Sequence, residues 1–389
     1  MPTEPVSLRM ELLSLWQQLE PSAWLRALFT FLVVAALVPA SLPLARRWGL
    51  VDHPGGRKQH NGAIPVTGGA VILLAMLASY GLFEADWNLR KAAFIGGALM
   101  LVVVGQLDDK YDLRWTWRIA AQALAAVLLA LLAGVSAHNL QDVFGFAAAN
   151  IGLLSLPFTV FVVVGIINAL NMADGVDGLA GSLALVSLAL FTGFALYAGD
   201  LFLAERLLAL GGAVMGFLLW NKRSPWLPQA KVFLGNGGSM LLGFILAWAA
   251  LRLTQNPEHP VSPVLGPWTL ALPLIDCVAL MLRRMRNGKS PFRADRNHMH
   301  HLLLDAGFTP GKVTVIIAGG SLALGIAAAC AVKLGVYRPA LVLAFLVLLL
   351  AWYLFTRRRE VAVAHLRRLR GGAPAPAAAL RAAEESGEH

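Results

Sequence analysis

The chain has 389 residues, of which 58% are hydrophobic and 14% charged, with a formal net charge of +10. Soluble domains are roughly 45–50% apolar and about 25% charged, so this composition excludes an ordinary soluble enzyme, a secreted disulfide scaffold and a disordered chain. It predicts an all-α, polytopic integral membrane protein, because lipid admits only helices or closed barrels as spanning structures. The two cysteines lie in apolar runs and offer neither a disulfide framework nor a metal site.

Eleven apolar runs are candidates for membrane-spanning helices, each of which needs about 20 mostly apolar residues. The break between the sixth and seventh runs depends only on Ala198-Gly199-Asp200. Together the runs predict a helical bundle of about eleven transmembrane helices. They lie near 24–44, 66–83, 91–107, 118–135, 156–170, 180–198, 203–220, 239–254, 268–283, 313–333 and 339–356.

The distribution of Lys and Arg predicts how the bundle is oriented. Eleven crossings place the connecting segments alternately on two sides, and 24 of the 32 Lys and Arg residues fall on one side, against five on the other. Basic residues accumulate in cytoplasmic loops, so we expect a periplasmic N-terminus and a cytoplasmic C-terminus. The positive charge is then a signal of topology, and we expect contact with membrane lipids and none with nucleic acid.

Three regions follow from this pattern. Residues 1–21 lack the features of a signal peptide and are expected to form an interfacial segment on the periplasmic side. Residues 22–356 form the transmembrane domain, and residues 357–389 form a basic tail that is expected to lie on anionic headgroups and to be partly disordered. The cytoplasmic loops of the transmembrane domain are expected at 45–64, 108–118, 171–181, 221–238 and 283–312.

The first two cytoplasmic loops contain basic and acidic candidates. Lys58 and His60 precede Pro65, where the second span begins, and the alternative is a loop that serves only topology. Asp108 and Asp109 are adjacent carboxylates at a helix end. Adjacent acids repel each other unless a cation or a basic group compensates them, so this pair is a candidate cation or phosphate site; the alternative is a solvated helix cap.

The next two loops suit a cation and a phosphate. Segment 168–181, NALNMADGVDGLAG, has no Lys or Arg but contains Asn171, Asp174 and Asp177 between glycines. Carboxylates and amides on such a loop are typical of a hard-cation or nucleotide site; the alternative is a glycine-rich turn. Segment 231–239, KVFLGNGGS, offers small residues and free backbone N–H groups at a helix start, which suits phosphate but is a weak signal alone.

The last cytoplasmic loop, 283–312, carries His298, His300 and His301 among several arginines. Zinc is disfavoured, because no cysteine is near and the surrounding positive charge repels a cation. The cluster fits phosphates and sugar hydroxyls better; the alternative is a topological anchor. Asp276, inside the ninth span, is a buried carboxylate and therefore a functional candidate, or else a partner of Arg283 or Arg284.

Acidic motifs that suit Mg²⁺ and basic motifs that suit phosphate thus share the cytoplasmic face of the bundle. Mg²⁺ held by a few carboxylates and by substrate phosphates is the usual arrangement for phosphoryl transfer. The substrates would be a cytoplasmic phosphate compound and a molecule resident in the membrane.

The order of these motifs along the chain resembles that of a known family. Over roughly residues 40–315 the chain resembles the polyprenyl-phosphate N-acetylhexosamine-1-phosphate transferases, and within them the bacterial branch that uses UDP-GlcNAc and undecaprenyl phosphate. The motifs that carry the resemblance are RKQHNGAIPVTGG, LDDKYDL, NALNMADGVDGLAG, KVFLGNGGS, HPVSP and RRMRNGKSPFRADRNHMHH. The last motif separates this branch from the peptidoglycan branch.

The resemblance implies a reaction and a setting. Undecaprenyl phosphate would attack the β-phosphorus of UDP-GlcNAc and release UMP, with Mg²⁺, or Mn²⁺ in its place, on the pyrophosphate. This would be the first membrane step of O-antigen or related cell-surface polysaccharide synthesis, in the bacterial inner membrane. The resemblance also implies a homodimer and a bent or broken ninth span that opens a groove for the polyprenyl chain.

The resemblance assigns roles to residues of this chain. The carboxylates would mainly position an acceptor phosphate that is already largely ionised, and Phe233 would stack on uracil beside Asp177. The implied catalytic residues are Asp108, Asp109, Asp174 and His298; those that bind substrates are Lys58, Asn171, Asp177, Phe233, Arg296, His300 and His301; and those that bind the metal are Asn236 and Asn171.

The chain departs from the family pattern at Asn236. The family usually reads G-D-x-G-S where this chain reads Gly235-Asn236-Gly237-Gly238-Ser239, and the aspartate is the family's main Mg²⁺ ligand. Mg²⁺ favours carboxylates, so the amide predicts weaker metal binding and strongly reduced turnover. The change is either an engineered, inactivating substitution made to trap a complex or a natural variation with compensation nearby.

Three other functions stay open. The same reaction with another UDP-N-acetylhexosamine would use the same motifs, and a catalytically silent nucleotide- or lipid-binding scaffold would explain Asn236. A secondary transporter is disfavoured, because transporters place polar residues near the midplane on broken helices, whereas the charges here cluster in loops at one face.

Overall fold

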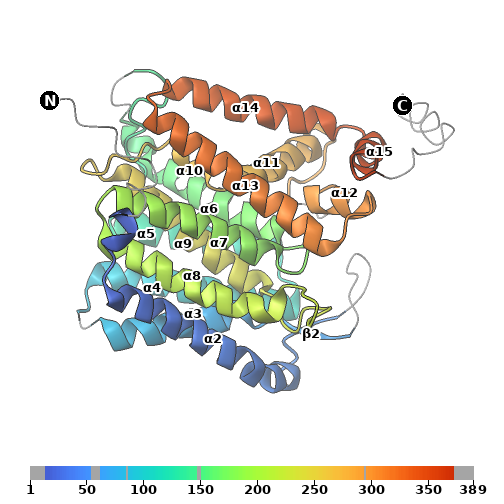
Figure 1. Ribbon diagram of the computed structural model, residues 1–389, viewed down its shortest axis with the longest axis horizontal. Coiled ribbons are helices and arrows are strands. Elements are labelled where there is room, and N and C mark those ends of the chain that lie inside the picture. The colour runs from blue at the N-terminus through green and yellow to red at the C-terminus, as the bar shows by residue number, and fades with distance from the viewer. Residues whose placement is uncertain (1–13, 54–61, 85, 147–149, 293–294, 372–389) are drawn as a thin grey trace.

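A computed structural model describes residues 14–53, 62–84, 86–146, 150–292 and 295–371. In these residues the chain forms a bundle of packed helices with one short β-hairpin (Figure 1). The elements are α2 (Pro21–Arg47), β1 (Val51–Asp52), β2 (Ile64–Pro65), α3 (Gly68–Phe83), α4 (Leu89–Tyr111), α5 (Trp115–Leu131), the 3₁₀ helix η1 (Gly152–Leu154), α6 (Ser155–Ala173), α7 (Leu179–Tyr197), α8 (Leu201–Asn221), α9 (Gly235–Gln255), α10 (Leu265–Trp268), α11 (Ala271–Arg286), α12 (Met299–Asp305), α13 (Pro310–Lys333), α14 (Arg338–Phe355) and α15 (Arg359–Leu369).

The helices confirm a polytopic, all-α membrane protein. Eight of the helices in the described residues are long and apolar enough to cross a bilayer, while α3 and α5 are apolar but shorter. A helix lies at each of the eleven predicted runs, with α11 at the ninth. The exact number of crossings stays a prediction, because helix length and composition alone mark eight. The eight are α2, η1 with α6, and α4, α7, α8, α9, α13 and α14.

The break predicted at Ala198-Gly199-Asp200 is present. Helix α7 ends at Tyr197 and α8 begins at Leu201. Gly199 has a φ of +73°, a left-handed conformation that glycine adopts without a Cβ clash. The Asp200 carboxylate accepts a hydrogen bond from the Leu203 backbone N–H at 3.0 Å and caps α8. Two short-range signals therefore separate two antiparallel spans.

The ninth predicted span, 268–283, is interrupted, as the resemblance implies. Helix α10 ends at Trp268 and α11 begins only at Ala271. Pro273 stands in the first turn of α11, where its missing N–H costs no helical hydrogen bond. The observed α11 therefore begins and ends three residues later than the predicted run, and it carries Asp276 into the bundle.

Helix α9 is the buried centre of the bundle. Almost all of its side chains are buried, and it packs against α3, α4, α6 and α7. Its first turn touches two neighbours at glycines: a Cβ on Gly69 would lie 2.2 Å from the Gly238 nitrogen, and a Cβ on Gly105 would lie 2.2 Å from the Gly237 nitrogen. Small residues let helix backbones approach closely, so this glycine contact fixes the start of α9 beside α4.

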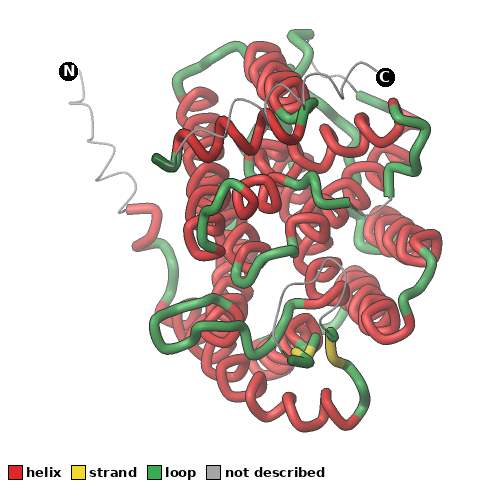
Figure 2. Tube along the Cα trace, turned by 90° about the vertical axis from the view of Figure 1, so that its right-hand side faces the viewer, coloured by secondary structure: helices red, strands yellow, loops and turns green. Residues whose placement is uncertain are grey.

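One end of the bundle gathers the elements that carry the polar motifs. The first residues of α3, α7 and α9 and the last residues of α4, α6 and α8 meet there, together with α12 and the hairpin, in which Val51 pairs with Pro65. Figure 2 looks onto this end, where the two strands and several loops lie among helices seen nearly end-on. We call it the motif end of the bundle.

Candidate functional site

Asp109 and Asn236 form the centre of the site at the motif end. The Asp109 carboxylate accepts hydrogen bonds from the Asn236 backbone N–H at 3.0 Å and from its Nδ2 at 2.8 Å. Gly235, which begins α9, has a φ of +75°, and a Cβ there would lie 2.6 Å from Asp109 Oδ2. The glycine therefore lets the carboxylate of α4 reach the first free backbone N–H of α9.

Asn171 extends this cluster from the end of α6. Its Nδ2 donates to Asn236 Oδ1 and to Ser239 Oγ, both at 2.8 Å. The structure thus brings together three residues that are widely separated in the sequence, Asp109, Asn171 and Asn236. Ser239 was quoted in the motif but not assigned a role, and its position one turn after Asn236 is the signal that places it here.

Asp108 faces away from this cluster. Successive residues on a helix point about 100° apart, and the buried Asp108 carboxylate accepts a hydrogen bond from Arg118 Nη1 of α5 at 3.1 Å. Arg118 compensates Asp108, while Asp109 is held by α9. The two adjacent acids therefore have different partners, which sequence analysis did not separate.

The loop between α6 and α7 brings further carboxylates to the motif end. Asp177 accepts a hydrogen bond from Arg223 Nε at 2.7 Å. Burial raises the pKa of Asp174 to about 7, and the negative charges of Asp109 and Asp177 add to the increase. The buried Asn221 side chain accepts from the Gly178 N–H at 2.9 Å and fixes the loop. Asn221 and Arg223 were not predicted as site residues.

Phe233 lies beside the hairpin, just before α9. Its backbone N–H donates to the Pro65 carbonyl at 2.8 Å, and its carbonyl accepts from the Gly68 N–H at 3.1 Å. Its side chain is half-buried. The backbone of segment 231–234 is thereby fixed against the start of α3, in the neighbourhood of Asp109. Lys58 and His60, which were predicted for the same face, lie outside the described residues.

The histidine motif is organised by Asp276. His298 Nδ1 lies 3.0 Å from Asp276 Oδ2, while Asp276 Oδ1 accepts from the Met299 backbone N–H at 3.0 Å and from Trp352 Nε1 at 3.1 Å. The expected pairing of Asp276 with Arg283 or Arg284 is wrong. Arg284 Nε instead donates to Asp295 at 2.8 Å, because the start of α12 folds back over α11 and presents its own donors to Asp276.

His300 connects the two halves of the site, which are the cluster around Asp109 and the histidine motif around Asp276. Its Nε2 lies so close to Gly175 that a Cβ there would be 2.3 Å away. Burial lowers the pKa of His300 well below the usual value, and the charges of His301 and His298 lower it further. Burial, together with His298 and Arg296, lowers the pKa of His301 to about 4. Both rings are therefore neutral at pH 7 and serve as hydrogen-bonding groups.

Two buried nitrogens of this region remain available to a ligand. Within the described residues neither Arg296 Nε nor His301 Nδ1 has a hydrogen-bond partner. An unpaired buried polar group lowers the stability of the folded protein by about 1–3 kcal/mol. The presence of two such nitrogens therefore favours a bound molecule as their hydrogen-bond partner. Arg296 Nη2 lies 4.0 Å from Asp305 Oδ1, a distance that suits a loose ion pair but is too long for a hydrogen bond.

The carboxylates at the motif end fit a divalent cation. In the described part of the chain no three His, Cys, Asp or Glu residues are arranged as a complete metal site. Mg²⁺, however, usually takes one or two carboxylates and completes its shell with water and substrate phosphates. The negative charge of Asp109 raises the pKa of Asp174, and the Asn236 side chain joins Asp109 to Asn171 through its Nδ2 and its Oδ1. A hard cation would relieve this repulsion.

Known proteins are similar to this chain in sequence. A family model described as glycosyl transferase family 4 matches residues 91–254. The undecaprenyl-phosphate alpha-N-acetylglucosaminyl 1-phosphate transferase of Escherichia coli O157:H7 is 35% identical over 85% of this chain and 92% of its own length. Proteins of the same name from Haemophilus influenzae and Yersinia pestis are 37% and 35% identical, over 74% and 75% of this chain and 81% and 79% of their own lengths. The chain is therefore a transferase that belongs to glycosyl transferase family 4.

Proposed function

We propose that this protein transfers N-acetylglucosamine 1-phosphate from UDP-GlcNAc to undecaprenyl phosphate, giving undecaprenyl-diphospho-GlcNAc and UMP. The observation that carries the proposal is the meeting at one end of the bundle of the Asp109, Asn171 and Asn236 cluster with the His298, His300 and His301 motif across Gly175. The names of the relatives supply the sugar and the lipid.

The donor binds between the two halves of the site. Uracil stacks on Phe233 and contacts the Asp177 loop, while the diphosphate and the sugar lie toward α12. Arg296 Nε and His301 Nδ1 have no partner in the described residues, so they are free to bind the phosphate and the acetamido sugar. The neutral imidazoles donate and accept hydrogen bonds, and Arg296 supplies the positive charge.

The acceptor phosphate approaches the end of α4. Asp108 holds Arg118, and this guanidinium positions the phosphate, whose monoester is already largely ionised at neutral pH. A phosphate oxygen forms a bond to the β-phosphorus of the donor, the bond from that phosphorus to the bridging oxygen breaks, and UMP leaves with this oxygen. Asp108 therefore acts mainly by positioning, and proton removal is secondary.

Mg²⁺, or Mn²⁺ in its place, is the cofactor in this proposal. Asp109 with the side-chain oxygens of Asn236 and Asn171 would hold it, and Asp174 lies near enough to add charge. When bound, the cation neutralises charge on the diphosphate. Because Asn236 replaces a carboxylate by an amide, the cation is held more weakly and turnover is low, which leaves a silent binding scaffold as the second candidate.

The setting follows from the charge distribution. We place the protein in the bacterial inner membrane, with the motif end and the C-terminus in the cytoplasm and the N-terminus in the periplasm, because 24 of its 32 Lys and Arg residues fall on one side. The resemblance to the family, and not the charge distribution, supports the two remaining parts of the proposal, which are that the protein catalyses the first membrane step of O-antigen or related polysaccharide synthesis and that it is a homodimer.

The test is UMP release in detergent from UDP-GlcNAc, undecaprenyl phosphate and Mg²⁺, with the chain beside its Asn236→Asp variant. We expect turnover to rise strongly in the variant. Asp109→Asn in the Asn236→Asp background is the matched control, because it keeps a single carboxylate and should remove the gain. If the unchanged chain and its Asn236→Asp variant turn over at the same rate, position 236 does not provide the metal ligand. If neither does while UDP-GlcNAc binds, the scaffold or another donor sugar is favoured.

A further inference from the structure

A cavity lies at the end of the bundle opposite the motif end. It has a volume of about 650 Å³ and is bounded by α2, α3, α4, α8 and α9. Helix α4 gives the distance between this cavity and the candidate functional site, because Lys91 lies in the cavity wall and Asp109 in the site. The two residues are 18 positions apart on one helix, which is about 27 Å at 1.5 Å per residue. The cavity therefore shares none of the site's residues.

Most of the cavity wall is apolar. Leu73 and Met76 come from α3, and Ile245 and Trp248 from α9. Phe94 packs against Trp248 with ring centroids 4.8 Å apart, so the floor is a fixed hydrocarbon and aromatic surface. A wall of this kind suits an alkyl chain and does not suit a small hydrated ion.

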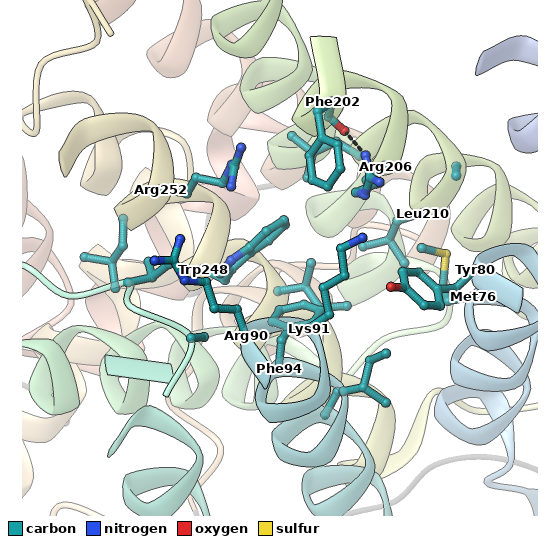
Figure 3. A pocket seen from close by; sticks show the side chains of 18 of the residues that line it. Met76, Tyr80, Arg90, Lys91, Phe94, Phe202, Arg206, Leu210, Trp248 and Arg252 are labelled. Carbon is teal, nitrogen blue, oxygen red and sulfur yellow. Dashed lines mark hydrogen bonds between the residues drawn. The ribbon is translucent and has the colours of Figure 1, made fainter. Parts of the chain in front are cut away.

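The rim of the cavity is positively charged. Five Lys and Arg side chains line it, against the two carboxylates Glu84 and Glu205, an excess of three positive charges. Figure 3 shows Arg206 and Arg252 on one side and Arg90 and Lys91 on the other, around the cavity. The five are Arg26, Arg90, Lys91, Arg206 and Arg252.

Ion pairs within the protein do not use all of this charge. Arg206 binds Glu84 at 2.6 Å, and Lys91 and Arg252 bind Asp86 and Asp200, each at 2.9 Å. These last two carboxylates lie outside the lining. Among the described residues Arg90 makes no ion pair, although it lines the cavity. The rim therefore keeps at least one cation for an anionic ligand.

We propose that this cavity binds an anionic phospholipid. The phosphate lies at the rim near Arg90, Lys91 and Arg252, and one acyl chain lies along the apolar floor. Charge-assisted hydrogen bonds to phosphate are strong, while a soluble anion would leave the floor empty and a neutral lipid would leave the rim uncompensated. A volume of about 650 Å³ suits a headgroup with the start of one chain, and Lys, Arg and aromatic residues are typical of the membrane interface.

The experiment is native mass spectrometry of the delipidated protein, titrated with phosphatidylglycerol or with phosphatidylcholine of the same acyl chains. We expect one phosphatidylglycerol to bind per chain, about tenfold more tightly than phosphatidylcholine, because only the former carries net charge. Arg90→Gln should weaken it about tenfold, since it removes a cation without breaking an internal ion pair. Met76→Trp should abolish binding by filling the cavity.

Two controls separate this site from general attraction and from misfolding. Lys333→Gln removes the same charge at the end of α13, away from the cavity lining, and should leave phosphatidylglycerol affinity unchanged. UDP-GlcNAc affinity should be equal in every variant. The proposal is overturned if both phospholipids bind alike, if Arg90→Gln and Met76→Trp retain phosphatidylglycerol, or if undecaprenyl phosphate occupies the cavity in its place.

Discussion

At Asn236 one amide serves two neighbours. Its Nδ2 donates to Asp109 and its Oδ1 accepts from Asn171, both at 2.8 Å. The cluster is therefore complete as a hydrogen-bonded unit without a cation. An aspartate at this position would keep the acceptor toward Asn171 but would place a second negative charge against Asp109.

We expect Asn236→Asp to make stability depend on Mg²⁺. Without the ion, the two carboxylates repel each other and a hydrogen bond is lost, so the free energy of unfolding should fall by about 1–3 kcal/mol. With Mg²⁺ the loss should be recovered. Thermal unfolding with EDTA and with Mg²⁺ measures this, and an equal Mg²⁺ response in both proteins would contradict it.

Asp276 orients His298 and accepts two further hydrogen bonds, from Met299 and Trp352. In Asp276→Asn an amide N–H₂ would face one of these donors and would turn the His298 ring. We expect turnover, measured in the Asn236→Asp background, to fall about 10–100-fold, as when the carboxylate behind a functional histidine is removed.

The kinetic constants and the melting temperature of Asp276→Asn distinguish a positioning role from a purely structural one. If Asp276 positions His298, its loss should raise the KM for UDP-GlcNAc and lower kcat, while the melting temperature changes little. The control is Asp142→Asn, whose carboxylate lies 3.9 Å from Arg338 near the start of α14 and should change neither constant. A parallel loss of folded protein would assign Asp276 to stability instead.

These residues show where sequence analysis succeeds and where it stops. Polar side chains are conspicuous in an apolar chain, so the acidic and histidine motifs could be found by composition alone. The partners could not, because Asp276 and His298 are 22 residues apart on α11 and beside α12, and no periodicity relates them. The same limit applies to Asp108 and Asp109, whose different directions depend on how α4 packs.

At the scale of elements, the contact of α9 with α3 and α4 decides the geometry of the site. Glycines at the crossing remove the Cβ atoms that would otherwise hold the helices apart. The predicted runs placed these helices well, because long apolar segments are a strong signal. The resemblance implied a broken ninth span, but the apolar runs could not predict that the break lies between Trp268 and Ala271. They also could not predict that α15 packs against α12, because both features depend on tertiary contacts.

Gly105→Ala tests the crossing directly. The added Cβ would lie 2.2 Å from the Gly237 nitrogen, so α4 and α9 must separate, and we expect the free energy of unfolding to fall by about 1–3 kcal/mol. UDP-GlcNAc should also bind more weakly. Gly96→Ala is the matched control on the same helix, since no atom lies within 4 Å of a Cβ there. Equal melting temperatures for the two variants would refute the assignment.

The histidines of α12 predict how stability depends on pH. His301 titrates near pH 4 in the folded protein and at about 6.5 when unfolded, so the unfolded chain binds more protons between these values. Stability should therefore fall as the pH decreases from about 6.5 toward 4. His301→Gln should reduce the fall in melting temperature between pH 7 and pH 5, measured by fluorescence. His365→Gln, on the exposed surface of α15, should not, and an unchanged slope in His301→Gln would contradict the prediction.

At the scale of the whole molecule, the bundle has two differently built ends. The motif end collects acidic, amide and histidine side chains on helix termini, and the opposite end surrounds an apolar cavity with cations. The charge count in the sequence could predict which side is basic overall. It could not predict the cavity, because Arg90 and Arg252 are 162 residues apart and only the packing of α4 against α9 brings their helices together.

The tail helix α15 has a consequence for the donor side of the site. Asp305 at the end of α12 is shared: Arg359 of α15 forms an ion pair with it, Arg367 donates to its carbonyl at 3.3 Å, and Arg296 approaches the same carboxylate at 4.0 Å. The tail and Arg296 thus compete for one anion. In a chain truncated before Arg359, Asp305 would pair with Arg296 and, in the proposed complex, would draw that guanidinium away from the donor phosphate. The arginines of α15 therefore neutralise Asp305 and leave Arg296 available for a ligand.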